Sequence, residues 1–194
     1  AASDVYKRQD LDATFLDLCA GTGALIPRLS RRCGKVVAAD ISPQMLAVGR
    51  RRHSCIKNCE WVEADAQTLP FSDETFDAIS IAYGIRNVPD RVRALREALR
   101  VSKPGATLVI LEFGQARNRL WRAIFGWYSR VVIPWVGGLI SGERSAYEYL
   151  PKTSAAFPAG EQFEYLLKEA GWVPLATRSL NGGVAYIYVA RKTG

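Results

Sequence analysis

Short apolar runs alternate with amphipathic stretches over most of this chain, and this alternation restricts its fold more than any other feature. Five runs have the length and apolar content of buried strands, at residues 15–18, 35–39, 60–64, 76–82 and 107–113. Helical periodicity follows three of these runs, at about residues 24–32, from Ser42-Pro43 onward and at about 90–101. Strands joined by helices pair in parallel through right-handed crossovers. The order therefore predicts an α/β fold, a three-layer sandwich with helices on both faces of a sheet.

The end of the chain departs from this alternation. Residues 161–170 have the pattern of an amphipathic helix, and two β-like runs follow at 173–180 and 184–190. Asn181-Gly182-Gly183 separates the two runs and is a hairpin turn signal. The whole pattern predicts a mostly parallel seven-stranded sheet that ends in an antiparallel hairpin.

Size and composition exclude several classes of protein. The 194 residues fit one domain, and they contain no run of about 20 uncharged apolar residues that would predict a transmembrane helix. The four cysteines form no disulfide framework, which suits a reducing cytoplasm. His53, Cys55 and Cys59 lie too close together for a standard zinc spacing, so we expect no metal.

The net charge of +7 raises the question of a nucleic-acid partner. The arginines fall on the expected helices, three of them at residues 50–52, and such positions are usually solvated helix faces. No RNA motif or aromatic-laced basic groove accompanies them, so we expect no nucleic-acid binding. Attraction to an anionic membrane surface or to an acidic partner stays open.

A glycine-rich turn follows the first expected strand and predicts a ligand site. Asp17 precedes the turn, which contains Gly21, Thr22 and Gly23. A dinucleotide fingerprint needs a third glycine where this chain has Ile26, so the match to a nicotinamide enzyme fails. S-adenosylmethionine carries an amino-acid tail instead of a pyrophosphate, and an acidic Asp17 suits the ammonium group of that tail.

Two more carboxylates occupy the same position relative to their strands. Asp40 ends the second expected strand, where it can accept hydrogen bonds from both ribose hydroxyls. Asp65 and Ala66 follow the third, where the carboxylate can accept from the adenine amino group and the next N–H can meet the ring. Ligands bind at this edge of an open α/β sheet. The alternative is that each aspartate is a turn or cap residue, which is common for one aspartate but not for three in register.

Longer motifs resemble those of the ubiquinone/menaquinone biosynthesis C-methyltransferase family (UbiE/MenG type). Many methyltransferases share the motifs from the first part of the chain. GIRNV at 84–88 and the segment at 147–158 occur in far fewer of them, and these two carry the resemblance to this family. The matching segments are LDLCAGTG at 16–23, VVAADIS at 36–42, EADAQTLPF at 63–71, FDAISIAYGIRNV at 76–88, RVSKPGATLVILEF at 100–113 and YEYLPKTSAAFP at 147–158.

The resemblance implies a Rossmann-like class I methyltransferase fold over residues 13–194, with S-adenosylmethionine as the cofactor and S-adenosylhomocysteine as its product. It implies C-methylation of a polyprenylated quinol, either demethylmenaquinol or a benzoquinol, in menaquinone or ubiquinone biosynthesis. The cofactor contacts that it implies are at Thr22, Asp40, Asp65, Ala66 and Ala82. Residues 1–12 do not resemble the family, and we expect a foreign leader or a truncated N-terminus there.

The chemistry of such a reaction selects candidate catalytic residues after the fourth strand. A quinol carbon becomes a good nucleophile when the neighbouring hydroxyl loses its proton. Arg86 stays protonated, so we expect it to stabilise the phenolate or to organise a water, with Asn87 orienting either. Tyr83 and Tyr147 are candidate substrate contacts. The alternative for Arg86 is a structural ion pair.

Residues 118–158 are expected to form a substrate lid. Their apolar and aromatic part, 120–140, is interrupted by arginines, a proline and a glycine pair, so it should not span a bilayer. A lid over a prenyl tail, an interfacial helix and packing in the core or in a homodimer all remain open.

Two other functions remain beside the quinol methyltransferase. One is methyl transfer to another small lipophilic acceptor, and the other is a cofactor-binding remnant without activity. For the preferred function we expect a cytoplasmic protein that meets the inner face of the membrane.

Overall fold

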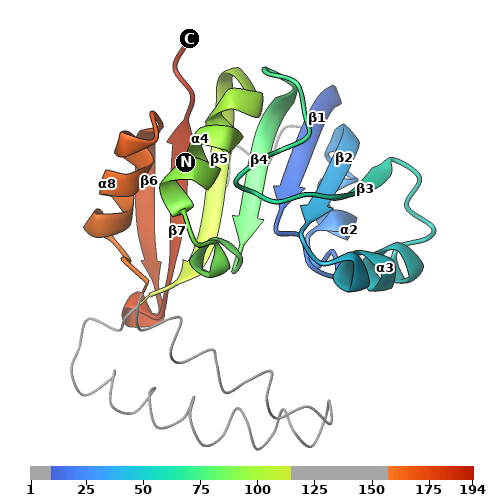
Figure 1. Cartoon of the computed structure of the whole chain (residues 1–194), viewed down its shortest axis with the longest axis horizontal. Coiled ribbons are helices and arrows are strands. Elements are labelled where there is room, and N and C mark those ends of the chain that lie inside the picture. The colour runs from blue at the N-terminus through green and yellow to red at the C-terminus, as the bar shows by residue number, and fades with distance from the viewer. Residues whose placement is uncertain (1–9, 115–156) are drawn as a thin grey trace, which may run out of the picture.

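The computed structural model describes residues 10–114 and 157–194, which form a layered α/β structure (Figure 1). The seven strands of its sheet are β1 (Asp10–Leu18), β2 (Cys33–Asp40), β3 (Cys59–Glu63), β4 (Phe76–Ala82), β5 (Ser102–Phe113), β6 (Val173–Leu180) and β7 (Ala185–Arg191). The α-helices in the described ranges are α2 (Ile26–Leu29), α3 (Pro43–Arg52), α4 (Arg91–Val101) and α8 (Glu161–Glu169).

The strand order is β3-β2-β1-β4-β5-β7-β6. The pairs among β1 to β5 are parallel, whereas β7 pairs antiparallel with both β5 and β6. A short 3₁₀ turn, Asn181–Gly183, joins the last two strands. The predicted mostly parallel sheet with a terminal antiparallel hairpin is therefore confirmed.

Successive residues of the central strands point into two separate cores, which makes the sheet the middle layer. Leu16 and Leu18 of β1 belong to the larger core, together with apolar residues of α4 and α8. Val36 and Ala38 of β2 belong to the smaller core, together with Ile26 of α2. Because side chains alternate across a strand, the two cores lie on opposite faces. In Figure 1, α8 lies beside β6, while α3 lies at the other end of the sheet.

Local capping sets where two of the helices begin. The Ser42 hydroxyl accepts a hydrogen bond from the Met45 N–H at 3.3 Å and caps α3. The Asp90 carboxylate accepts from the Arg93 N–H at 2.9 Å and caps α4. Both are standard N-cap interactions. The helix expected over about 24–32 is shorter, because α2 begins after Leu25, which has no capping oxygen, and ends at Leu29 before the chain turns into β2.

Several sequence expectations lie outside the described residues. They concern Tyr147, the apolar stretch 120–140, the lid at 118–158 except its last two residues, and residues 1–9 of the expected leader. The expected leader boundary after residue 12 falls within β1. Among the described helices, none is both long and apolar enough to cross a membrane.

Candidate active site

The sequence-predicted ligand residues meet at the carboxyl edge of the parallel strands. Leu18, the last residue of β1, pairs with Ala39 of β2 on one side and with Ile81 of β4 on the other. Asp40, at the end of β2, pairs with Glu63 of β3. The loops that follow these four strands therefore leave the sheet along one edge, as the sequence predicted.

The glycine turn after β1 has a backbone that only some residues can adopt. Gly21 and Gly23 have φ values of 55° and 77°, a left-handed conformation that favours glycine. A Cβ at Gly23 would lie 2.4 Å from the ring of Trp61, whereas a Cβ at Gly21 would meet nothing within 4 Å. Gly23 thus packs against the protein, while the backbone of Gly21 borders open space that a ligand can approach.

Asp40 fixes this turn to the end of β2. Its Oδ2 accepts a hydrogen bond from the Gly21 N–H at 2.8 Å, and its Oδ1 accepts from the Ser42 N–H at 2.9 Å. An ionised carboxylate has about four acceptor positions, so acceptor capacity remains for other donors such as hydroxyl groups. The side chain of Thr22 lies nearby on the same turn, and its hydroxyl accepts from Arg52 at 3.4 Å.

Asp17 lies beneath the turn rather than facing solvent. Its side chain is buried, and its Oδ1 accepts a hydrogen bond from the Ser80 hydroxyl of β4 at 2.6 Å. Burial, with a smaller contribution from the charge of Asp40, raises the pKa of Asp17 to about 7, against the lowering effect of the Ser80 hydrogen bond. The sequence reasoning missed Ser80, which lies within an apolar run.

Asp65 and Ala66 stand at the start of the connection from β3 to β4. Both carboxylate oxygens of Asp65 accept hydrogen bonds from Gln67, and the backbone bond from the Gln67 N–H is 2.8 Å long. These bonds, helped by the charge of Arg93, lower the pKa of Asp65 below its usual value. Asp65 is thus held as a charged acceptor at the edge of the sheet.

A buried ion pair joins Arg86, on the loop after β4, to Glu112 of β5, a partner that the sequence did not predict. Nη1 of Arg86 lies 2.8 Å from Oε1 of Glu112, and both side chains are almost completely buried. Nη1 also donates to the Tyr83 carbonyl, and the Arg86 N–H donates to Oε2 of Glu112 at 3.2 Å. The Phe113 N–H donates to Oε1 of Glu112 at 2.9 Å. The sequence left a structural ion pair open as the alternative to a catalytic role for Arg86, and the structure contains such an ion pair.

The other candidates on this loop are more accessible. Asn87 is exposed, and Tyr83 is 37% exposed with its ring against Phe113 at a centroid distance of 4.4 Å. Ala82, the last residue of β4, is half-buried. His53 is half-exposed, and its ring stacks against that of Trp61 at a centroid distance of 6.1 Å. The described part of the site therefore offers an accessible amide and phenol ring beside the almost completely buried guanidinium of Arg86.

A close approach between the loops after β1 and β4 gives a first prediction. A Cβ at Gly84 would lie 2.2 Å from the Cβ of Cys19, so we expect Gly84→Ala to lower the free energy of unfolding by about 2–3 kcal/mol through overpacking. Urea denaturation measures the change. Cys19→Gly in the same chain should recover part of it, since Cys19 has a φ of 58° and its side chain is the obstacle.

The matched control for this prediction is Gly105→Ala. Gly105 also has a positive φ, 79°, but a Cβ there would meet nothing within 4 Å. Gly105→Ala should therefore lower the free energy of unfolding by only about 1 kcal/mol, because alanine disfavours the left-handed backbone. Equal losses at Gly84 and Gly105 would show that the contact with Cys19 does not matter.

Comparison with known proteins gives consistent matches. The sequence model of the ubiE/COQ5 methyltransferase family matches residues 4–192. The ubiquinone/menaquinone biosynthesis C-methyltransferase UbiE of Idiomarina loihiensis is 36% identical over 197 residues, which cover 95% of this chain and 78% of that protein. The demethylmenaquinone methyltransferase of Staphylococcus aureus is 37% identical over 180 residues, which cover 91% and 75%.

Solved structures share the fold at lower identity. A SAM-dependent methyltransferase from Aquifex aeolicus has a TM-score of 0.71 at 20% identity, and the match covers 98% of this chain and 87% of that one. The [4+2]-cyclase SpnF has the same TM-score at 19% identity, with coverage of 99% and 80%. Because one of these two is described as a cyclase, the fold alone does not define the reaction.

Proposed function

Because the chain belongs to the ubiE/COQ5 methyltransferase family, we propose that it transfers a methyl group to a ring carbon of a polyprenylated quinol. The chain is an S-adenosylmethionine-dependent methyltransferase of quinone biosynthesis. The names of the similar proteins, which refer to ubiquinone, menaquinone and demethylmenaquinone, support demethylmenaquinol or a benzoquinol as the proposed acceptor. The structural observation that most supports the proposal is the hydrogen bond from Gly21 to Asp40, which joins the glycine turn to a carboxylate with acceptor capacity left.

The described residues fit the parts of S-adenosylmethionine. The open space at Gly21 suits the amino-acid tail, with Gly23 and Thr22 completing the turn. We assign Asp40 as the acceptor for the ribose hydroxyls. We assign Asp65 as the acceptor for the adenine amino group, with Ala66 beside the ring. The bound cofactor supplies a sulfonium methyl that is already electrophilic.

The protein then has to orient the acceptor and stabilise its charge. We assign Tyr83 to the acceptor ring, together with Tyr147 outside the described residues. The contacts of Arg86 to Glu112 and to the Tyr83 carbonyl both use Nη1, so other donors of the fork remain for a phenolate or a water. Asn87, exposed on the same loop, is placed to orient either one.

Asp40→Asn should weaken the binding of S-adenosylhomocysteine by about ten- to a hundredfold, since it removes charged hydrogen bonds to the ribose and to the glycine turn. Isothermal titration calorimetry measures the change. The control is Asp77→Asn at the opposite end of β4, where the carboxylate accepts from the Thr14 N–H at 2.9 Å. Equal affinities for the two variants would contradict the assignment of Asp40.

The acceptor class is tested by a comparison of acceptors. The protein is incubated with labelled S-adenosylmethionine and with demethylmenaquinol, a benzoquinol precursor, or a lipophilic amine. We expect transfer to one of the quinols. Transfer to the amine alone would favour the second candidate, a methyltransferase for another lipophilic acceptor, and binding of S-adenosylhomocysteine without any transfer would favour a remnant.

A polyprenyl tail resides in a bilayer, so we include a peripheral membrane contact in the proposal. The net charge of +7 supports contact with an anionic surface. Cosedimentation with vesicles that contain an anionic phospholipid tests this contact, and equal binding to neutral vesicles would contradict the electrostatic part. A homodimer remains a prediction, which the molar mass in solution decides.

A further inference from the structure

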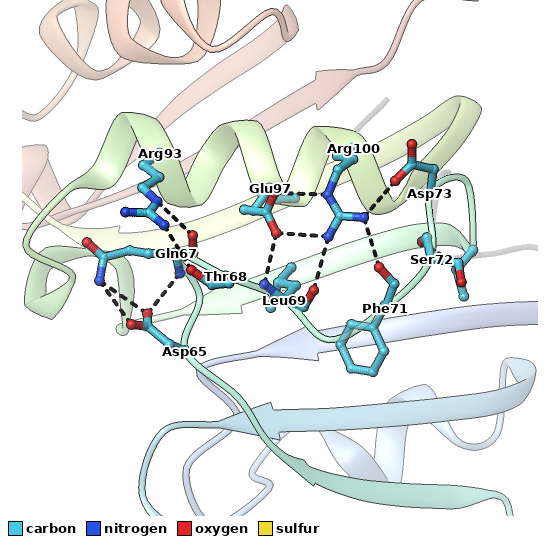
Figure 2. A network of polar contacts seen from close by, with 12 residues as sticks. Asp65, Gln67, Thr68, Leu69, Phe71, Ser72, Asp73, Arg93, Glu97 and Arg100 are labelled. Atoms are coloured by element: carbon cyan, nitrogen blue, oxygen red, sulfur yellow. Dashed lines mark hydrogen bonds and ion pairs between the residues drawn. The ribbon is translucent and has the colours of Figure 1, made fainter.

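We propose that Gln67 is a positioning residue that holds the Asp65 carboxylate ready for the adenine of the cofactor. The inference rests on the proposed function, since it takes Asp65 as the acceptor for the adenine amino group. It adds a residue for which no direct cofactor contact is assigned. Figure 2 shows Gln67 between Asp65 and helix α4.

Gln67 contacts Asp65 through two separate groups. The Gln67 N–H donates to Oδ1 of Asp65 at 2.8 Å, and the side-chain Nε2 lies 3.2 Å from each carboxylate oxygen. The Thr68 N–H also donates to the Asp65 carbonyl at 3.0 Å. The backbone and the side chain of residue 65 are both restrained in this way.

The direction of the Gln67 amide is set by helix α4. The Asp90 N–H, at the start of α4, needs an acceptor and donates to Oε1 of Gln67 at 3.1 Å. An amide that places its oxygen there must point its NH₂ group the other way, toward Asp65. Gln67 therefore acts as a donor to the carboxylate because its acceptor oxygen is already used.

Helix α4 is a rigid anchor for this arrangement. Its Ala94, Leu95 and Ala98 are completely buried in the larger core. From the first turn of the helix, Nε of Arg93 donates to the Gln67 carbonyl at 2.9 Å, and Nη2 donates to the Thr68 hydroxyl at 3.0 Å. The segment that carries Asp65 is thereby fixed to a helix rather than left as a free loop.

A second set of contacts fixes the far end of the same segment. Arg100 of α4 donates to the carbonyls of Leu69 and Phe71 and to the carboxylates of Asp73 and Glu97 (Figure 2). Glu97 in turn accepts from the Leu69 N–H at 2.9 Å. Because Arg100 already holds the segment, loss of the Gln67 side chain should remove the side-chain restraint on the carboxylate, and leave only the backbone bond from the Gln67 N–H, without releasing the segment.

The test compares two ligands that differ only at the purine 6-position. Calorimetry gives the Kd of S-adenosylhomocysteine and of its 6-deamino analogue, in which purine replaces adenine and a hydrogen replaces the amino group. The wild-type protein should prefer the adenosyl ligand at least tenfold, since the 6-deamino ligand has no amino group to donate to Asp65. Gln67→Met should lower this preference by about tenfold, toward that of Asp65→Asn. The control is Gln162→Met, at an exposed position of α8, which should keep the preference.

The ratio of the two affinities separates positioning from a general structural role. A merely structural loss would weaken both ligands equally and leave the preference unchanged, and this result would overturn the inference while leaving the role of Asp65 intact. A wild-type protein without the preference would overturn both. If Gln67→Met does not fold, Gln67→Glu serves. It keeps the acceptor for the Asp90 N–H, but it replaces the donor to Asp65 by an oxygen that repels that carboxylate. A retained preference there would likewise overturn the inference.

Discussion

Replacement of Arg86 by methionine should lower the free energy of unfolding by about 3–5 kcal/mol, the largest loss that we expect from one substitution in the described site. The reason is that Glu112, which is completely buried, would lose the cation 2.8 Å away and be left as an acidic group without its charge partner. Urea denaturation measures the loss. A loss below about 1 kcal/mol would show that the ion pair contributes little to the folded state.

A double variant separates the structural part of Arg86 from its proposed catalytic part. Arg86→Met combined with Glu112→Met removes both charges, and pairs of buried charges are often replaced by apolar residues at little cost. We therefore expect much of the stability to return. Methyl transfer should not return, because the donor to the phenolate is still absent. If the double variant recovered both stability and turnover, the role of Arg86 would be only structural.

Asp17→Asn should stabilise the protein at pH 8 by roughly 4 kcal/mol and remove a pH dependence of the wild type. Burial raises the pKa of Asp17 from 3.8 to about 7, and each unit corresponds to about 1.4 kcal/mol. Because the folded state binds this proton more tightly, its stabilising effect is complete below about pH 4 and is lost as the pH rises to about 7. Asparagine retains an acceptor for the Ser80 hydroxyl without the charge.

Unfolding curves between pH 4 and 8 test this expectation. The difference in unfolding free energy between wild type and Asp17→Asn isolates residue 17 from the other groups that titrate in this range. Ser80→Ala should have the opposite effect on the pH dependence. The hydrogen bond from Ser80 lowers the pKa of Asp17, so its loss should raise that pKa and make stability depend more strongly on pH. A difference that does not change with pH would contradict a buried, neutralised Asp17.

The layered fold was predictable because its signals are local. Runs of apolar residues predicted the strands, Ser42 predicted the start of α3, and the glycine pair after Asn181 predicted the hairpin. The ligand edge was predictable for the same reason, since Asp40 and Asp65 follow their strands directly. The short α2 was not, because its length depends on where the chain must turn to enter β2 rather than on helical propensity.

The polar contacts behind the site depend on residues far apart in the sequence. Asp17 and Ser80 are 63 positions apart, and Arg86 and Glu112 are 26 apart. A strand that is buried on both faces gives no alternation that would show which way Asp17 points. Glu112 did leave one signal: a carboxylate inside an apolar run needs a partner, and Arg86 was the cation already expected after the neighbouring strand.

The most direct test of the central claim is the atom that receives the methyl group. The protein is incubated with demethylmenaquinol and with S-adenosylmethionine labelled with ¹³C in its methyl group, and the product is examined by NMR. Carbon- and oxygen-bound methyl groups have clearly different chemical shifts. We predict that the label appears on the quinol ring carbon. Label on a phenol oxygen, or an unlabelled quinol with a protein that binds S-adenosylhomocysteine, would contradict the claim.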